Sequence, residues 1–115
     1  MFDLNGKSAL VTGASGDIGR AIATLLHAQG AAVALSGTKV EKLEALAREL
    51  GERAHVTPGD LSSAEGAESV AKAAEAATGG LDILVNNAGL TRDGLAMRMK
   101  DEDFGKPIIA VVNSF

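Results

Sequence analysis

Short apolar runs that suit β-strands alternate along this chain with longer segments of helical periodicity. The runs cover residues 8–12, 31–36, 54–57 and 81–86. Strands that alternate with helices in this way are typical of βαβ units, in which the strands run parallel and the helices cover the sheet. The sequence therefore predicts an α/β fold, a partial Rossmann domain with a doubly wound parallel sheet of four strands and a fifth strand at the C-terminus.

Three helical segments should pack on this sheet. In the first, apolar residues recur at intervals of three and four, and Gly30 follows as a stop signal. The second covers residues 40–50, and the third, 64–78, is mostly Ala. Asp60, Ser62 and Ser63 precede the third segment as N-cap candidates. Each helix is expected to turn one apolar face to the sheet.

The last stretch breaks this rhythm. Pro107 stands where the interior of a fourth helix would fall, and a proline there costs about 3 kcal/mol. Residues 107–112 are apolar and follow a turn signal at 105–106. We expect a buried fifth strand there, or a loose tail.

Charge and composition exclude several classes of function. The net charge of −4 argues against a general nucleic-acid surface. There is no Cys, and His27 and His55 lack the spacing of metal ligands, so no metal site is expected. No apolar run approaches the ~18–20 residues of a membrane span, and no basic segment followed by an apolar one marks the N-terminus. We expect a cytoplasmic protein without a membrane partner.

A glycine-rich segment joins the first strand to the first helix. Glycines at such a turn allow positive φ and close backbone approach, while the helix N-terminus offers N–H groups and a partial positive charge. The turn can hold the pyrophosphate of a dinucleotide, although a tight strand-to-helix turn without a ligand is the alternative. The candidate cofactor-binding residues are Gly13, Ala14, Ser15, Gly16, Asp17, Ile18 and Gly19.

This segment resembles the Thr-Gly-x-x-x-Gly-x-Gly fingerprint of the short-chain dehydrogenases/reductases. Asp17 departs from the fingerprint, because it stands at the second of the family's three glycines. A carboxylate there would crowd and repel a pyrophosphate, unless Gly16 supplies the flexibility and Asp17 points outward as an acid at the helix N-terminus. We favour the outward orientation.

The ends of strands two and three carry further candidates, because dinucleotides lie across the carboxyl ends of parallel strands. An NAD site would place an acid after strand two, whereas this chain has Gly37, followed by Thr38 and Lys39. The missing side chain and the added cation leave room for a 2′-phosphate and favour NADP(H), with a solvated lysine as the alternative for Lys39. After strand three, Asp60 and Leu61 resemble the family's pair whose carboxylate reaches the adenine amino group.

Strand four ends in Asn-Asn-Ala-Gly, which resembles the family's signature at this place. Adjacent amides at a strand end supply donors and acceptors that tie neighbouring strands together. Asn86 is expected to be structural, while Asn87, Ala88 and Gly89 are expected to contact the cofactor. The two signatures together are far more specific than either alone.

Residues 1–103 resemble the bacterial 3-oxoacyl-[acyl-carrier-protein] reductases, above all after Gly89. The resemblance implies a parent enzyme that transfers hydride from NADPH to a 3-oxoacyl thioester in fatty-acid synthesis, as a tetramer. Acyl-carrier protein would be a partner of that parent only. Arg98 and Lys100 are candidates for its docking face, with a solvated charged face as the alternative.

In that family an Asn, a Ser and a Tyr-x-x-x-Lys pair perform catalysis. This sequence contains no Tyr, and Asn113 matches the family's Asn poorly. Since proton donation requires a positioned acid, no catalytic residue is expected. The chain is interpreted as a truncated front half that is inactive alone.

Residues 104–115 resemble a strand-forming segment near the N-terminus of dihydroxy-acid dehydratases, without any cluster ligand because Cys is absent. The hypothesis is a chimera joined near 101–104. An NADP(H)-binding half at 1–103 and an appended strand at 104–115 would then share one domain.

Three functions are therefore open: a binding module for NADP(H), an enzyme completed by a second chain, and a structural fragment that binds nothing. An exposed sheet edge favours self-association, so a homo-oligomer through that edge is expected.

Overall fold

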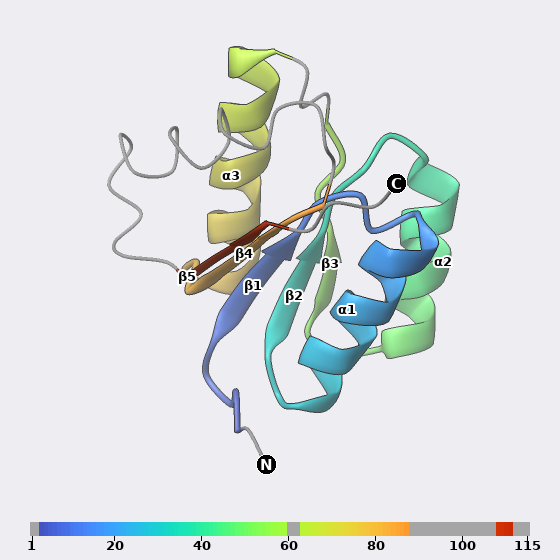
Figure 1. Cartoon of the computed structure of the whole chain (residues 1–115), viewed down its shortest axis with the longest axis vertical. Helices are drawn as coiled ribbons and strands as arrows, with labels where there is room; N and C mark the ends of the chain where they lie inside the picture. Colours follow the sequence, from blue (N-terminus) through green and yellow to red (C-terminus); the bar gives the residue numbers. More distant parts are fainter. Residues whose placement is uncertain (1–2, 60–62, 88–107, 112–115) are drawn as a thin grey trace.

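The computed structural model of the chain describes residues 3–59, 63–87 and 108–111, in which strands and helices alternate (Figure 1). The strands are β1 (Ser8–Val11), β2 (Ala32–Leu35), β3 (Ala54–Val56), β4 (Ile83–Asn86) and β5 (Ile108–Val111), and the helices are α1 (Asp17–Ala28), α2 (Val40–Leu50) and α3 (Ala64–Thr78). Every predicted strand is present, with its ends shifted by two residues or fewer. The predicted α/β class is confirmed.

All five strands lie parallel in one sheet, in the order β3-β2-β1-β4-β5. The chain builds outward from β1 through β2 to β3 and then returns to place β4 on the other side of β1. Helices α1 and α2 cover one face of the sheet, and α3 covers the other (Figure 1). The strand order reverses between β1 and β4, which makes their carboxyl ends the topological switch point where α/β proteins bind ligands.

The fifth strand extends the sheet beyond β4, with Asn86 in register with Val111. Its Ile-Ile-Ala-Val sequence is rich in the β-branched residues that suit strands. The predicted strand is confirmed over 108–111, and the alternative of a loose tail is wrong for these residues.

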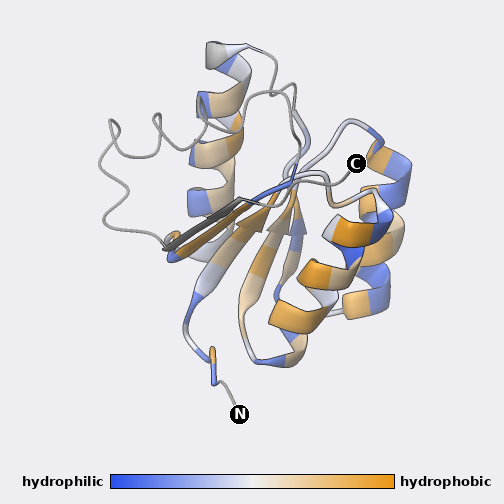
Figure 2. Cartoon of the chain, viewed as in Figure 1, coloured by the Kyte–Doolittle hydropathy of each residue, from blue (hydrophilic) through white to orange (hydrophobic). Residues whose placement is uncertain are grey.

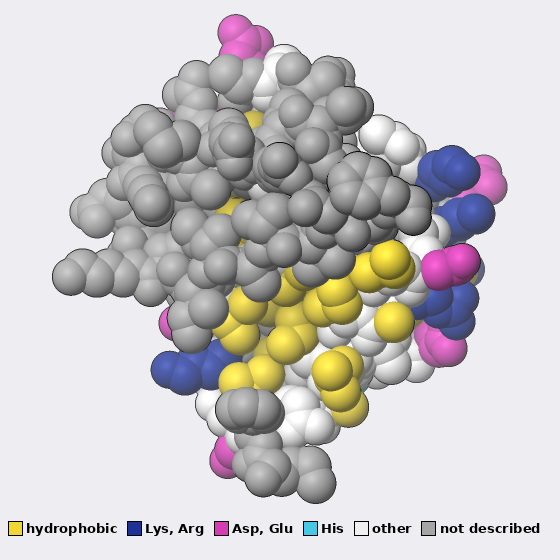
Figure 3. All heavy atoms as spheres, in the orientation of Figure 1, with side chains coloured by type: hydrophobic (Ala, Val, Ile, Leu, Met, Phe, Trp, Pro, Cys, Tyr) yellow, Lys and Arg dark blue, Asp and Glu magenta, His cyan; other side chains and the backbone are white. Residues whose placement is uncertain are grey.

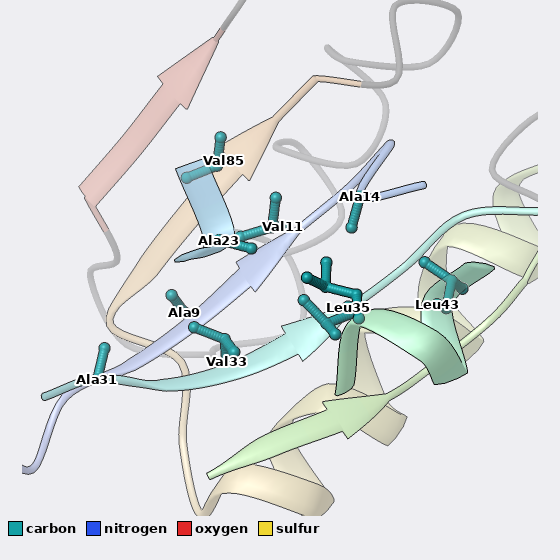
Figure 4. Close-up of a cluster of buried hydrophobic side chains, with 10 residues drawn as sticks. Ala9, Val11, Ala14, Ala23, Ala31, Val33, Leu35, Leu43 and Val85 are labelled. Carbon is teal, nitrogen blue, oxygen red and sulfur yellow. The ribbon is translucent and has the colours of Figure 1, made fainter. Parts of the chain in front are cut away.

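Alternate side chains of the central strands enter two apolar cores. Leu10 and Leu84 pack with Val70 on the α3 face. Val11 and Leu35 pack on the opposite face, beneath α1 and α2 (Figure 4). The hydropathy of the residues agrees with this arrangement. The central strands contain mainly hydrophobic residues, whereas α2 also carries hydrophilic ones (Figure 2). The alanines of α3 that are buried against the sheet are Ala67, Ala71 and Ala74.

Helix α3 begins at a side-chain cap. Ser63 Oγ accepts a hydrogen bond from the Gly66 N–H at 3.0 Å. An N-cap hydroxyl satisfies a donor that the helix itself cannot pair. The cap prediction is confirmed for Ser63, while the other candidates, Asp60 and Ser62, lie outside the described residues. Within the described ranges, no helix has the length and apolar character needed to cross a membrane.

Candidate functional site

Thr12 joins the carboxyl ends of β1 and β4. Its backbone N–H donates to the Val85 carbonyl at 3.0 Å, and its Oγ1 accepts from the Asn87 N–H at 2.8 Å. Thr12 Oγ1 also lies 3.4 Å from Asn86 Oδ1, to which it donates. All four residues are buried. The switch point is therefore held rigidly by side chains from both strands, and the predicted structural role of Asn86 agrees with this contact.

Two glycines shape the phosphate loop, which we define as residues 12–16 between β1 and α1. Gly13 has a φ of +63°, a conformation that side chains rarely adopt. A Cβ built at Gly19 would overlap the Gly13 carbonyl oxygen, so α1 begins in direct backbone contact with the loop. Gly16 is different, because a Cβ there would meet only the Gly13 oxygen, at 3.6 Å. The tight turn thus depends on the first and last glycines of the motif.

Asp17 is the first residue of α1, and it is exposed. A carboxylate at this position complements the partial positive charge of the helix N-terminus. Ile18, its neighbour, is 44% exposed and takes no part in the apolar cores. The exposed position of Asp17 agrees with the outward orientation favoured from the sequence, while its contact with a cofactor stays a prediction.

The end of β2 lies on the other flank of the loop. The Ala14 N–H donates to the Ser36 carbonyl at 3.0 Å. A Cβ built at Gly37 would lie 3.2 Å from Ser15 Oγ. The Ser15 hydroxyl therefore borders the position that the sequence analysis assigned to a 2′-phosphate, and the preference for NADP(H) stays a prediction.

Thr38 and Lys39 follow on the surface, and Lys39 is the N-cap residue of α2. Both are exposed at the same sheet edge as the phosphate loop, as expected. The position suits either a cofactor contact or a solvated helix start, so both interpretations of Lys39 stay open.

Four buried side-chain atoms have no hydrogen-bond partner within the described part of the chain. They lie at the carboxyl ends of β2, β3 and β4 and are Ser36 Oγ, Thr57 Oγ1, Asn86 Nδ2 and Asn87 Oδ1. Buried polar atoms in proteins are nearly always paired, and an unpaired one costs roughly 1–3 kcal/mol. Asn87 is 8% exposed and its Nδ2 lies 3.5 Å from the Gly13 carbonyl oxygen, to which it donates. Its free oxygen beside the glycine turn fits a polar ligand at the switch point.

Four predicted cofactor contacts lie outside the described residues, namely Asp60, Leu61, Ala88 and Gly89. The candidates Arg98, Lys100 and Asn113 also lie outside them. Gly59 is described, and a Cβ there would overlap the Val70 side chain. The turn after β3 therefore packs directly on α3 and leads toward the same sheet edge.

A cavity of about 210 Å³ opens between α1 and α2, beside the phosphate loop. We call it the α1–α2 cavity. Its walls are Ala14, Ser15, Asp17, Arg20, Lys42, Ala45, Leu46 and Glu49. Arg20 Nη2 lies 2.6 Å from Glu49 Oε2, which bridges the two helices. Figure 3 shows the neighbouring surface, where basic and acidic side chains alternate next to exposed hydrophobic ones.

Sequence reasoning missed Arg20, Lys42 and Glu49. Two sequence signals could have indicated the two cations. Lys42 follows Lys39 by about one helical turn, and Arg20 follows Gly16 by one turn at the start of α1. Among the described residues there is no cluster of three or more metal-ligand side chains of the His, Cys, Asp and Glu types.

Known proteins resemble this chain along most of its length. Residues 7–114 match the family described as short chain dehydrogenase. Nodulation protein G of Rhizobium sp. (strain N33) is 59% identical over 104 residues, which are 90% of this chain and 42% of that protein. The 3-oxoacyl-[acyl-carrier-protein] reductase of Rickettsia conorii is 48% identical over 109 residues, 94% of this chain and 43% of that protein. The chain thus spans about two fifths of the length of these relatives.

Solved structures share the fold. A 3-ketoacyl-(acyl-carrier-protein) reductase from Brucella melitensis, complexed with NADH, has a TM-score of 0.78 at 26% identity, over 88% of this chain and 50% of that one. A dehydrogenase/reductase from Sinorhizobium meliloti 1021 has a TM-score of 0.72 at 45% identity, over 76% of this chain and 36% of that one.

Proposed function

Because the chain belongs to the short-chain dehydrogenase family of oxidoreductases, we propose that it binds a nicotinamide dinucleotide across the carboxyl edge of its sheet. Members of this family bind such a cofactor, which supplies a hydride when bound. The proposal assigns the pyrophosphate to the phosphate loop and the first turn of α1. It assigns the ribose next to the nicotinamide to the end of β4, at Asn87 and the predicted contacts Ala88 and Gly89.

The observation that carries this proposal is the pairing of Gly13 with Asn87 at the switch point. Gly13 has no Cβ and its backbone faces the Asn87 amide nitrogen, while Asn87 Oδ1 is buried without a partner in the described part of the chain. A hydroxyl or amide of a ligand would satisfy that oxygen. A simple strand-to-helix turn has no need of an unpaired buried amide, so the ligand-free interpretation of the motif is disfavoured.

We further propose that NADP(H) is preferred over NAD(H). Position 37 carries no acid that could accept a hydrogen bond from the ribose 2′-OH, and the Ser15 hydroxyl lies close to this position. Lys39 adds an exposed cation close by. The solved relative with NADH shows only that a related protein accepts the dephosphorylated cofactor.

The substrate of the complete enzyme is a separate proposal. The similarity to a 3-oxoacyl-[acyl-carrier-protein] reductase supports a 3-oxoacyl thioester as the hydride acceptor, with acyl-carrier protein as partner of the parent. These 115 residues contain no Tyr to donate the proton, so we expect cofactor binding without turnover.

Three smaller predictions remain proposals. Residues 104–115 would be a segment of separate origin appended to residues 1–103, and β5 at 108–111 is compatible with that idea. A homo-oligomer would form through an exposed edge of the sheet, and β3 lies at one edge. A cytoplasmic location is the third.

The proposed function is tested by titrating the purified chain with NADPH and, separately, with NADH, with binding measured by calorimetry. We expect saturable binding at one site, tighter for NADPH. The variant Asn87→Leu, which keeps the branching of the side chain and removes both of its polar atoms, should lose most of the affinity. Absence of binding by the unmodified chain would favour the structural-fragment hypothesis. Reduction of an acetoacetyl thioester above background would contradict the inactivity.

A further inference from the structure

Helix α1 carries a second apolar row, separate from the face that it buries against the sheet. The buried face contains Gly19 and Ala23. The second row follows intervals of three, four and three residues, which keep its members on one side of the helix. We call it the α1 stripe, and it consists of Ile18, Ala21, Leu25 and Ala28.

All four residues of the α1 stripe are exposed, and Leu25 is 61% exposed. Hydrophobic side chains are seen on the surface over α1 (Figure 3). A single exposed leucine is ordinary on a protein surface, whereas a row with this spacing is not. Apolar residues at alternating intervals of three and four form the seam between helices that pack side by side. The α1 stripe therefore has the pattern of a helix–helix seam on an exposed side of the helix.

An open groove of about 700 Å³ runs beside the α1 stripe. The small residues Ala21, Thr24 and Ala28 line it, together with Leu25 and with Glu49 from α2. The same surface thus offers a large side chain that can enter a groove and a groove that can receive one. Packing of two helices requires both features. A surface that carries both can bind a second copy of itself.

The order of large and small residues specifies how two copies would meet. In an antiparallel pair of α1 helices, Ile18 faces the partner's Ala28, and Ala21 faces the partner's Leu25. Each large side chain then meets a small one, which allows close packing. A parallel pair would place alanine against alanine and leave gaps. The antiparallel arrangement also brings the N-terminus of each helix near the C-terminus of the other, where their partial charges attract.

We propose that the α1 stripe is the interface of a homodimer, in which α1 packs antiparallel against α1 of a second copy of this chain. Such an interface is isologous, so each substitution acts twice in every dimer. The two helices would be in contact over about 15 Å, the rise of an α-helix across ten residues, which suits a weak dimer. The interface is separate from the sheet edge at β3, and it requires no cofactor.

Sedimentation equilibrium over a range of chain concentrations tests this interface. Leu25→Asp should raise the dissociation constant of the dimer about a hundredfold, because two carboxylates would be buried in each dimer. Val40→Asp is the matched control and should leave the dimer unchanged. Val40 is also an exposed hydrophobic residue, at 42%, but it lies on α2 outside the stripe. Circular dichroism checks that both variants are folded.

An exchange of side chains tests the antiparallel orientation. Leu25→Ala should weaken the dimer about tenfold, since it leaves alanine opposite alanine. The double variant Ala21→Leu/Leu25→Ala again places a large residue opposite a small one, so it should recover most of the affinity. Thr24→Leu/Leu25→Ala is the control, because it returns the same leucine one position outside the stripe, and it should recover none.

Loss of the dimer in Leu25→Asp but not in Val40→Asp, with recovery only when the leucine is placed at position 21, supports the proposal. A monomer at every concentration overturns it and leaves the stripe to a different partner. A dimer that Leu25→Asp does not weaken also overturns it, in favour of the sheet edge. Equal recovery in the two double variants overturns the antiparallel pairing. The proposed function is decided separately, by the titration with NADPH and NADH.

Discussion

The two flanks of the phosphate loop differ in what holds them. The flank toward β4 is built from Gly13, Thr12 and Asn87, which are held by backbone contact and buried hydrogen bonds. The flank toward α2 is built from Arg20, Lys42 and Glu49, whose charged ends are exposed. Steric contacts in a close-packed region tolerate little change, whereas exposed charges can be exchanged at small cost. On the proposed function, the first flank would fix where the cofactor lies, and the second would tolerate substitution.

The largest effect is expected from Gly19→Ala on the rigid flank. Its Cβ would overlap the Gly13 carbonyl, so the backbone must shift, at about 1–3 kcal/mol of unfolding free energy. Urea denaturation followed by circular dichroism measures the loss. Gly16→Ala is the control, since its Cβ has only one ordinary contact, at 3.6 Å. Equal losses for the two variants would remove the steric basis of the comparison.

Thr12→Val should be nearly as damaging. The variant keeps the shape of the side chain but leaves the buried Asn87 N–H without its acceptor, which costs roughly 1–3 kcal/mol. Dinucleotide binding should weaken together with stability, because Asn87 is no longer held. Calorimetric binding measured well below the melting temperature separates the two effects. Unchanged stability would mean that water replaces the hydroxyl and that this flank is less rigid than described.

Gly37→Asp acts at the border between the flanks. The carboxylate would stand where NAD-binding proteins place their ribose acceptor, and it would repel a 2′-phosphate. We expect NADPH to bind about tenfold more weakly, or about 1.4 kcal/mol, with a smaller change for NADH. Gly37→Ala is the control, because it adds the contact with Ser15 without adding a negative charge. If Ala has the same effect as Asp, the position acts through packing alone.

The smallest effect is expected from Asp17→Asn on the adjustable flank. Loss of the charge at the helix N-terminus should lower stability by about 0.3–1 kcal/mol. NADPH binding should strengthen modestly, because one negative charge leaves the phosphate side of the loop. Both differences should shrink in 1 M salt, where screening acts over about 3 Å. Salt-independent differences would point to a steric role for Asp17.

The sequence predicted the rigid flank better than the adjustable one, for a physical reason. Strand ends and the glycine turn follow from local patterns, as at Thr12 and Gly13. The Arg20–Glu49 pair joins residues 29 positions apart, and only the packing of α1 on α2 brings them together.

The strand order also sets when the binding edge comes into existence. β1 pairs with β2 about two dozen residues away, but its partner β4 lies 74 residues along the chain, as in the pair Ala9 and Ile83. Closing the longer loop costs more entropy and slows that pairing. We therefore expect β1, β2 and their helix to assemble early and the β1–β4 seam to close late, which pulse-labelled amide exchange during refolding would reveal. The Thr12–Asn87 junction is then the last part to form, and a ligand seated on it would select chains that have finished folding.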